Sequence, residues 1–130
     1  MQLSLAAIFL GLTVVSAAPT VVTRDEPANC GGKSYTAQQV SDAIDEGCSY
    51  FESGSDVNSY PHRYSNYEGF DFKGLDGPFQ EFPIISGGVY TGGSPGADRV
   101  VFTEDSCALA GTITHTGASG NAFVACEGTS

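Results

Sequence analysis

Few side chains in this sequence can exchange protons near neutral pH, and the two histidines, His62 and His115, stand out among them. An imidazole titrates close to neutral pH, so each histidine is a candidate acid or base. Glu81 lies in an otherwise apolar run, where a carboxylate needs either a partner or a function. Arg99 keeps its charge throughout this pH range. The alternatives are structural: a lone strand histidine is more often structural than catalytic, and Glu81 could be a paired core residue.

A run of aromatic residues begins at Tyr60 and encloses a short polar loop. Tyr60, His62 and Tyr64 alternate along the chain, which places them on one face of a strand. The loop that follows offers an amide at Asn66 and a carboxylate at Glu68. Aromatic rings beside such groups suit stacking on a flat base while its edge is hydrogen-bonded. A purely hydrophobic turn, the alternative, would not need polar residues between tyrosines.

Composition narrows the class of protein further. Five Lys and Arg against 15 Asp and Glu give a net charge of −10, which argues against gripping nucleic acid by a broad basic face. An enzyme that holds one nucleotide in a small pocket stays possible. The hydrophobic fraction of 41%, without repeats or charge blocks, excludes a disordered tail or a coiled coil. The sequence contains no C-x-x-C pair, which argues against a zinc site, and we expect neither a metal nor a cofactor.

The amino-terminal segment has the pattern of an export signal. Leu3 to Val15 is almost entirely apolar, and Ser16-Ala17-Ala18 supplies small residues for cleavage, which predicts a signal peptide at residues 1–17; a buried helix is the alternative. Residues 18–24 then read as a pro-segment ending at Arg24, and residues 25–130 as the functional domain. The apolar run is too short to span a bilayer, and no later run is longer. We therefore expect a secreted, extracellular protein without a membrane partner.

Four cysteines lie in the expected domain, at Cys30, Cys48, Cys107 and Cys126. An even number in a small exported domain predicts two disulfides. Three pairings are possible, and the spacing alone does not choose among them.

One segment has a clear helical pattern. Its apolar positions recur every three or four residues: Ala37, Val40, Ala43, Ile44, Cys48 and Phe51. Thr36 and Gln39 form a capping-box pattern at its start, and Gly54 ends it. Strands are expected at 60–64, 79–85, 99–102, 109–114 and 122–126. The glycine-rich stretch 92–96 lacks the Gly-Lys-Ser/Thr ending of a phosphate loop and is interpreted as a turn.

These elements predict an α+β fold, with one α-helix packed on a short-stranded antiparallel β-sheet. At this size the core is modest, so the two disulfides should matter for stability.

Four motifs, in this order, carry a resemblance to a known family. They are Tyr-Pro-His-x-Tyr-x-Asn-Tyr-Glu-Gly-Phe-Asp-Phe at 60–72, Glu-Phe-Pro-Ile at 81–84, Gly-Gly-Ser-Pro-Gly-Ala-Asp-Arg-Val-Val at 92–101, and Ile-Thr-His-Thr-Gly-Ala-Ser-Gly-Asn at 113–121. From Cys30 to Cys126 the chain resembles the fungal guanyl-specific ribonucleases. The resemblance implies a secreted endoribonuclease that cleaves single-stranded RNA after guanosine.

In that family the ribose 2′-hydroxyl attacks the adjacent phosphorus, and the resulting 2′,3′-cyclic phosphate is hydrolysed to a 3′-phosphate. The residues that match its catalytic positions are Tyr60, His62, Glu81, Arg99, His115 and Phe123. Glu81 matches the general base and His115 the general acid. His62 matches the imidazolium beside the base.

Two more matching positions contact the phosphate, at Tyr60 and Arg99, and Phe123 matches the apolar wall behind it. No metal is implied, and DNA, which lacks the 2′-hydroxyl, should not be cleaved. A non-catalytic secreted effector that binds RNA or a host protein on the same scaffold is the alternative function.

The resemblance also implies a guanine site. Its matching residues are Tyr64, Ser65, Asn66, Tyr67, Glu68 and Asn121. Glu68 would accept hydrogen bonds from guanine N1–H and the exocyclic amino group, and Tyr64 and Tyr67 would sandwich the base. The family often has Asn where this chain has Ser65, so the loop conformation could differ.

The disulfide pairing follows from the resemblance as well. It implies Cys30–Cys126 and Cys48–Cys107, in a protein that acts as a monomer.

Overall fold

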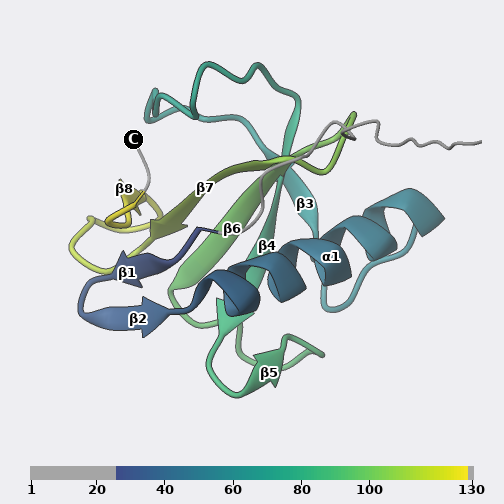
Figure 1. The fold of residues 1–130 in the computed structure, drawn as a ribbon, viewed down its shortest axis with the longest axis horizontal. Coiled ribbons are helices and arrows are strands. Elements are labelled where there is room, and N and C mark those ends of the chain that lie inside the picture. Colours follow the sequence, from purple (N-terminus) through teal and green to yellow (C-terminus); the bar gives the residue numbers. More distant parts are fainter. Residues whose placement is uncertain (1–25, 129–130) are drawn as a thin grey trace, which may run out of the picture.

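The computed structural model describes residues 26–128, in which one helix lies across an antiparallel sheet (Figure 1). The expected signal peptide and pro-segment lie outside the described residues. The helix is α1 (Ala37–Ser53), and the strands are β1 (Ala28–Cys30), β2 (Lys33–Tyr35), β3 (His62–Tyr64), β4 (Phe79–Ile85), β5 (Gly88–Val89), β6 (Asp98–Thr103), β7 (Leu109–Thr114) and β8 (Val124–Ala125). Within the described part of the chain, no helix has the length and apolar character needed to cross a membrane.

Helix α1 begins and ends where the sequence predicts. The Thr36 side chain accepts a hydrogen bond from the Gln39 backbone, and the Gln39 side chain accepts one from the Thr36 backbone. Gly54 closes the helix with φ of 73°, a left-handed conformation that glycine adopts at little cost. The helix buries the stripe of Val40, Ile44 and their neighbours against the sheet.

The main sheet has the strand order β3-β4-β6-β7-β8, with β5 paired to β4. All its pairs are antiparallel. The bounds of β4 and β7 agree with the prediction, and β6 is one residue longer at each end. The strand expected at 60–64 begins at His62, and the one expected at 122–126 spans only 124–125. The short strands β1, β2 and β5 were not predicted, because two or three residues are too few to display an alternating pattern.

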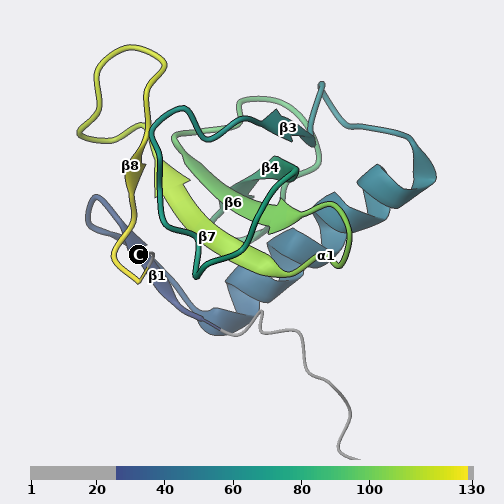
Figure 2. The same ribbon diagram turned by 90° about the horizontal axis from the view of Figure 1, so that it is seen from above.

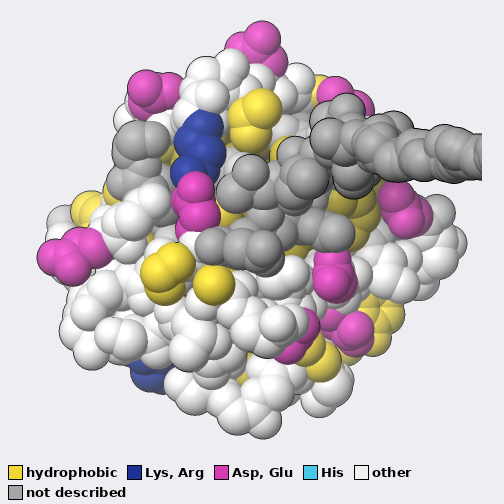
Figure 3. All heavy atoms as spheres, in the orientation of Figure 1, with side chains coloured by type: hydrophobic (Ala, Val, Ile, Leu, Met, Phe, Trp, Pro, Cys, Tyr) yellow, Lys and Arg dark blue, Asp and Glu magenta, His cyan; other side chains and the backbone are white. Residues whose placement is uncertain are grey.

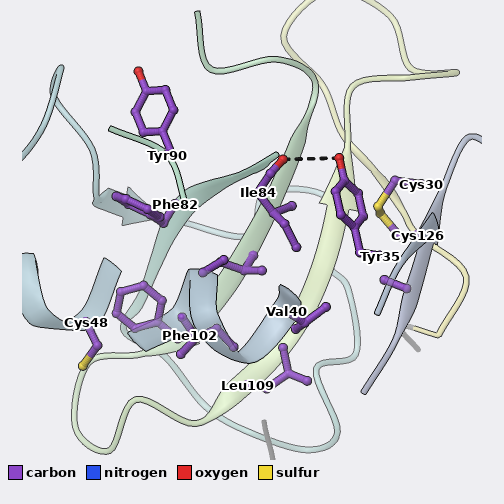
Figure 4. Close-up of a cluster of buried hydrophobic side chains, with 14 of the residues drawn as sticks. Cys30, Tyr35, Val40, Cys48, Phe82, Ile84, Tyr90, Phe102, Leu109 and Cys126 are labelled. Carbon is purple, nitrogen blue, oxygen red and sulfur yellow. Dashed lines mark hydrogen bonds between the residues drawn. A yellow bond between two sulfur atoms is a disulfide. The ribbon is translucent and has the colours of Figure 1, made fainter. Parts of the chain in front are cut away.

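The sheet has two differently used faces. Because side chains alternate along a strand, Phe82, Val100 and Phe102 share one face and belong to the larger core. Figure 4 shows Phe82 and Phe102 beside α1. Figure 2 shows α1 on that one side of β4, β6 and β7. On the opposite face a smaller cluster contains Val101, Ile113 and several aromatic rings. The predicted α+β architecture is therefore confirmed.

Two disulfides join distant parts of the domain. Cys30–Cys126 ties the β1–β2 hairpin to the segment after β8, and Cys48–Cys107 ties α1 to the turn between β6 and β7. Both agree with the pairing that the resemblance implied. On the face viewed in Figure 3, acidic side chains are scattered over the surface rather than gathered in one patch.

Candidate active site

The register of the sheet brings the predicted acid–base residues to its second face. His62 on β3 lies directly opposite Glu81 on β4. Glu81 lies opposite Val101 on β6, so Arg99, two residues earlier, is its diagonal neighbour on the same face. Thr114 on β7 pairs with Val124 on β8, and His115 follows directly after β7. Residues up to 53 positions apart in the chain therefore share one surface.

These side chains line one pocket of about 290 Å³. Its lining consists of Tyr60, His62, Glu81, Arg99, His115, Asn121 and Phe123. All six predicted catalytic residues are among them, together with one residue of the predicted guanine site. A pocket of this size suits a small ligand or one part of a larger one.

Glu81 is the central carboxylate of this pocket and is 5% exposed. Its Oε1 accepts a hydrogen bond of 3.2 Å from Arg99 Nε, and its Oε2 lies 3.8 Å from His62 Nδ1. Burial raises the pKa of Glu81 above its usual value, while His62 and Arg99 act in the opposite direction. A carboxylate with a raised pKa binds a proton more readily and is a better general base.

Arg99 is held from several sides and is only 3% exposed. Its Nη1 donates to the backbone carbonyls of Gly96 at 2.9 Å and of Asp98 at 3.0 Å. Its Nη2 donates to the Tyr60 hydroxyl at 3.1 Å. The glycine-rich turn that the sequence predicted at 92–96 thus supplies a carbonyl that orients the guanidinium. The result is a fixed positive charge beside Glu81.

His115 is oriented by Ala122 and Phe123, which come shortly before β8. Its Nδ1 lies 2.7 Å from the carbonyl oxygen of Ala122, and its ring stacks on Phe123 with centroids 3.9 Å apart. When Nδ1 donates to this carbonyl, Nε2 is the nitrogen left for chemistry. The stack also limits rotation of the imidazole, which a proton donor needs if it is to act along one direction.

The predicted guanine residues form a loop next to this pocket. Asn66 adopts a φ of 56°, and its side chain closes the loop through two hydrogen bonds to the Phe70 backbone. The Asn66 carbonyl also accepts a hydrogen bond of 3.0 Å from the Gly69 N–H, so both its side chain and its carbonyl hold the loop in shape. Tyr67 is 94% exposed, whereas Tyr64 is buried at 7% and its ring edge meets Phe123. The two rings expected to enclose a base are therefore in very different environments.

Glu68 connects this loop to the catalytic pocket. Its Oε1 accepts a hydrogen bond of 2.6 Å from the Tyr64 hydroxyl, and its Oε2 accepts one of 3.0 Å from the Phe123 backbone N–H. Loss of hydration beside the neighbouring rings acts to raise the pKa of Glu68, but these hydrogen bonds outweigh it and the pKa is lowered. The side chain is exposed and ionised at neutral pH.

Residues of the same loop also line a larger pocket of about 600 Å³. Its lining includes Tyr64, Ser65 and Asn66 but none of the predicted catalytic residues. Among residues 26–128, one group of potential metal ligands clusters, formed by Cys48, Glu52 and Cys107. Its two sulfurs are joined to each other in a disulfide, so they are not free thiolates.

Sequence reasoning missed Asp98 and the backbone of residues 122–123. The Asp98 carboxylate accepts hydrogen bonds from the hydroxyls of Tyr35 and Thr114 and is 5% exposed. An acidic residue beside a strand arginine in an apolar run was the available signal. No sequence signal indicated the role of the 122–123 backbone, because peptide groups are the same whatever the side chain.

The fold and the site together define a ribonuclease. The family model described as ribonuclease matches residues 23–127, and the chain belongs to this family. It is 60% identical over 107 residues to guanyl-specific ribonuclease Th1 of Trichoderma harzianum, which covers 80% of this chain and 100% of the relative. It is 54% identical to guanyl-specific ribonuclease F1 of Fusarium fujikuroi, over 91% of this chain and 90% of the relative.

A solved structure supports the same fold. RNase He1 from Hericium erinaceus superposes with a TM-score of 0.60 at 40% identity, covering 78% of this chain and 98% of that chain. The resemblance seen in the sequence motifs is thus confirmed over nearly the whole domain.

Proposed function

We propose that this chain is a guanyl-specific endoribonuclease that cleaves single-stranded RNA on the 3′ side of guanosine. The observation that carries the proposal is the single pocket in which Glu81, Arg99 and His115 meet. A carboxylate, a fixed cation and an imidazole around one small space can act as the base, the charge stabiliser and the acid in transfer of a phosphodiester. Relatives named guanyl-specific ribonucleases, at 54% and 60% identity, support guanine as the nucleobase that is recognised.

In the first step Glu81 takes the proton of the ribose 2′-hydroxyl, and the 2′-oxygen attacks the adjacent phosphorus. The bond from phosphorus to the 5′-oxygen breaks, and His115 donates a proton to that oxygen. The products are a 2′,3′-cyclic phosphate and a free 5′-hydroxyl. In the second step the roles reverse, because His115 takes a proton from water and Glu81 returns one to the 2′-oxygen, leaving a 3′-phosphate.

The remaining residues of the pocket act on charge and position. Arg99 and Tyr60 contact the phosphate as its negative charge is redistributed, and the buried guanidinium needs no reorganisation to do so. His62, 3.8 Å from Glu81, orients that carboxylate and can share its proton. Phe123 forms the apolar wall that holds the His115 ring. Each acid or base partner contributes about 10²–10⁴-fold to the rate.

Guanine is recognised by the 64–68 loop together with Asn121. Glu68 accepts hydrogen bonds from N1–H and the exocyclic amino group, whereas adenine presents an acceptor at N1 and is rejected. A site built to pair a buried polar edge discriminates by roughly 10⁴-fold against a base that leaves it unpaired. The exposed Tyr67 ring closes over the base, with Tyr64 on its other side and the backbone of Ser65 and Asn66 at its edge.

We also propose that the protein is secreted and acts as a monomer without a metal or cofactor. Residues 1–17 would be removed as a signal peptide and residues 18–24 as a pro-segment. The name of a relative that is 57% identical, extracellular guanyl-specific ribonuclease Fl1 of Gibberella baccata, supports the export.

Digestion of a defined RNA, with all 3′ ends mapped, tests the function. We expect cleavage after every unpaired guanosine, cyclic phosphate ends early in the reaction, no effect of a chelator, and no cleavage of DNA of the same sequence. The variant His115→Ala is the matched control for contaminating nucleases. Cleavage after other bases at comparable rates, or equal activity of the variant, would contradict the proposal.

A further inference from the structure

Glu68 and His115 lie on opposite sides of a single peptide group, the one that joins Ala122 to Phe123. The carbonyl of this peptide lies 2.7 Å from His115 Nδ1, and its N–H donates to Glu68 Oε2 at 3.0 Å. The bond is trans, so the carbonyl and the N–H point in opposite directions within one rigid plane. The guanine-reading carboxylate is thus one peptide away from the general acid.

We propose that Glu68, besides reading guanine, is a positioning residue for the general acid His115, acting through the 122–123 peptide. This inference rests on the proposed function, since it concerns the proton donor of that reaction. The carboxylate fixes the N–H end of the peptide, and the fixed carbonyl end then sets the direction of the imidazole. Base recognition and leaving-group protonation share one chain of hydrogen bonds.

The far end of this chain is firmly held. Glu68 Oε1 accepts from the hydroxyl of Tyr64, whose ring is 7% exposed and packed among aromatic side chains. A hydrogen bond to an ionised acceptor is roughly twice as strong as a neutral one, and bonds in a chain reinforce one another. A carboxylate has about four acceptor sites, so guanine can bind Glu68 while both of these bonds persist.

Other groups near His115 act on its pocket side. The charged and titratable residues that line the pocket with it are Tyr60, His62, Glu81 and Arg99. Among the described residues, the hydrogen bond found for the ring goes to the Ala122 carbonyl, and the stacking contact is with Phe123. Both contacts come from residues 122–123, whose backbone Glu68 binds. Loss of Glu68 should therefore disturb the acid more than it disturbs the base Glu81.

Two substrates that share guanosine but differ in leaving group separate positioning from recognition. Cleavage of guanylyl-3′,5′-cytidine releases a 5′-alkoxide, which needs a proton from His115. Cleavage of guanosine 3′-(4-nitrophenyl phosphate) releases nitrophenolate, which departs without one. Any loss of guanine binding affects both substrates equally. The kcat/KM for guanylyl-3′,5′-cytidine divided by the kcat/KM for the nitrophenyl ester therefore reports only the action of the general acid.

In Glu68→Gln we expect this ratio to fall about tenfold relative to wild type, the scale of one hydrogen bond to a charged group. His115→Ala sets the limit for complete loss of the acid. Glu104→Gln removes a carboxylate that binds Arg63 outside the pocket and should leave the ratio unchanged. Tyr64→Phe keeps the ring and the Glu68 charge but removes one anchor, so its ratio should fall by less.

An unchanged or raised ratio in Glu68→Gln, with both kcat/KM values reduced, would overturn the inference and leave Glu68 as a recognition residue only. If wild type cleaved neither substrate, the proposed function itself would fail. Thermal unfolding is measured for every variant, and if Glu68→Gln does not fold, the ratio in Tyr64→Phe decides.

Discussion

Both faces of the β4–β6–β7 sheet contain buried side chains, but one face buries hydrophobic residues and the other also buries charged ones. On the face under α1, Phe82, Val100 and Phe102 are each 0% exposed and belong to a cluster of buried hydrophobic side chains. On the other face, Glu81 and Arg99 are 5% and 3% exposed and meet each other. The residues of both sets alternate along the same strands, so one short sequence specifies both faces.

The difference shows that stability and activity occupy opposite sides of one sheet. Apolar burial stabilises the fold by roughly 25 cal/mol per Å² of surface removed from water. A buried ion pair gives little net stability, because desolvation offsets the attraction. Charges retained on the second face therefore indicate function, and changes on the two faces should have separable effects.

The largest effect is expected for His115→Ala on the second face. Loss of the general acid should lower kcat/KM for guanylyl-3′,5′-cytidine by about 10²–10⁴-fold. The urea midpoint should stay close to wild type, because the imidazole is only half-buried and lies at the edge of the pocket rather than in the core. Steady-state kinetics and urea unfolding on the same preparation check both halves. Retention of most activity would break the assignment of catalysis to this face.

The counterpart on the helix face is Phe82→Ala. The ring is 0% exposed, so its removal leaves a cavity and should cost about 3–5 kcal/mol of unfolding free energy. The fraction that remains folded should keep kcat/KM near the wild-type value. A loss of activity in the folded state that matches that of His115→Ala would show that the two faces are not separable.

Asp98 and Arg99 sharpen the comparison, because they are neighbours in sequence that serve opposite faces. Asp98→Ala removes the acceptor found for the buried Thr114 hydroxyl, at about 1–3 kcal/mol, and leaves the Tyr35 hydroxyl with only its longer 3.3 Å hydrogen bond to the Ile84 carbonyl. Asp98→Asn keeps one acceptor oxygen and should lose less. Arg99→Lys, by contrast, should lower kcat/KM with a smaller change in Tm. Calorimetry and kinetics on the three variants test this ordering.

The smallest expected effect is a shift in pH dependence for His62→Gln. Burial raises the pKa of Glu81, and the cationic His62 opposes that rise. Without this cation the pKa of Glu81 rises further. Because Glu81 acts as a carboxylate, the increase of kcat/KM on the acid side should move to higher pH. His62→Lys keeps a positive charge, so its rise of kcat/KM on the acid side should lie closer to that of wild type. The same acid-side profile in both variants would argue against the electrostatic coupling.

Local elements were predictable because their signals are local. The capping box at Thr36 and the apolar stripe of α1 lie within one stretch of chain, and the strands at 79–85 and 109–114 are runs of six or seven residues bounded by turn residues. The hairpin of β1 and β2 was missed, since three residues in each strand carry no readable period. The predicted catalytic residues came from the family resemblance, and their meeting in one pocket is a consequence of strand register.

The sequence by itself determined the helix, the longer strands, the even set of cysteines and the identity of the chemically useful side chains. Each of these depends on residue type or on spacing within a few positions. The tertiary structure decided which side chains meet: Glu81 with Arg99 and His62, and the 122–123 peptide with both Glu68 and His115. Such contacts depend on how strands far apart in the chain are paired, and peptide groups, being the same in every residue, acquire individual roles only in the folded chain.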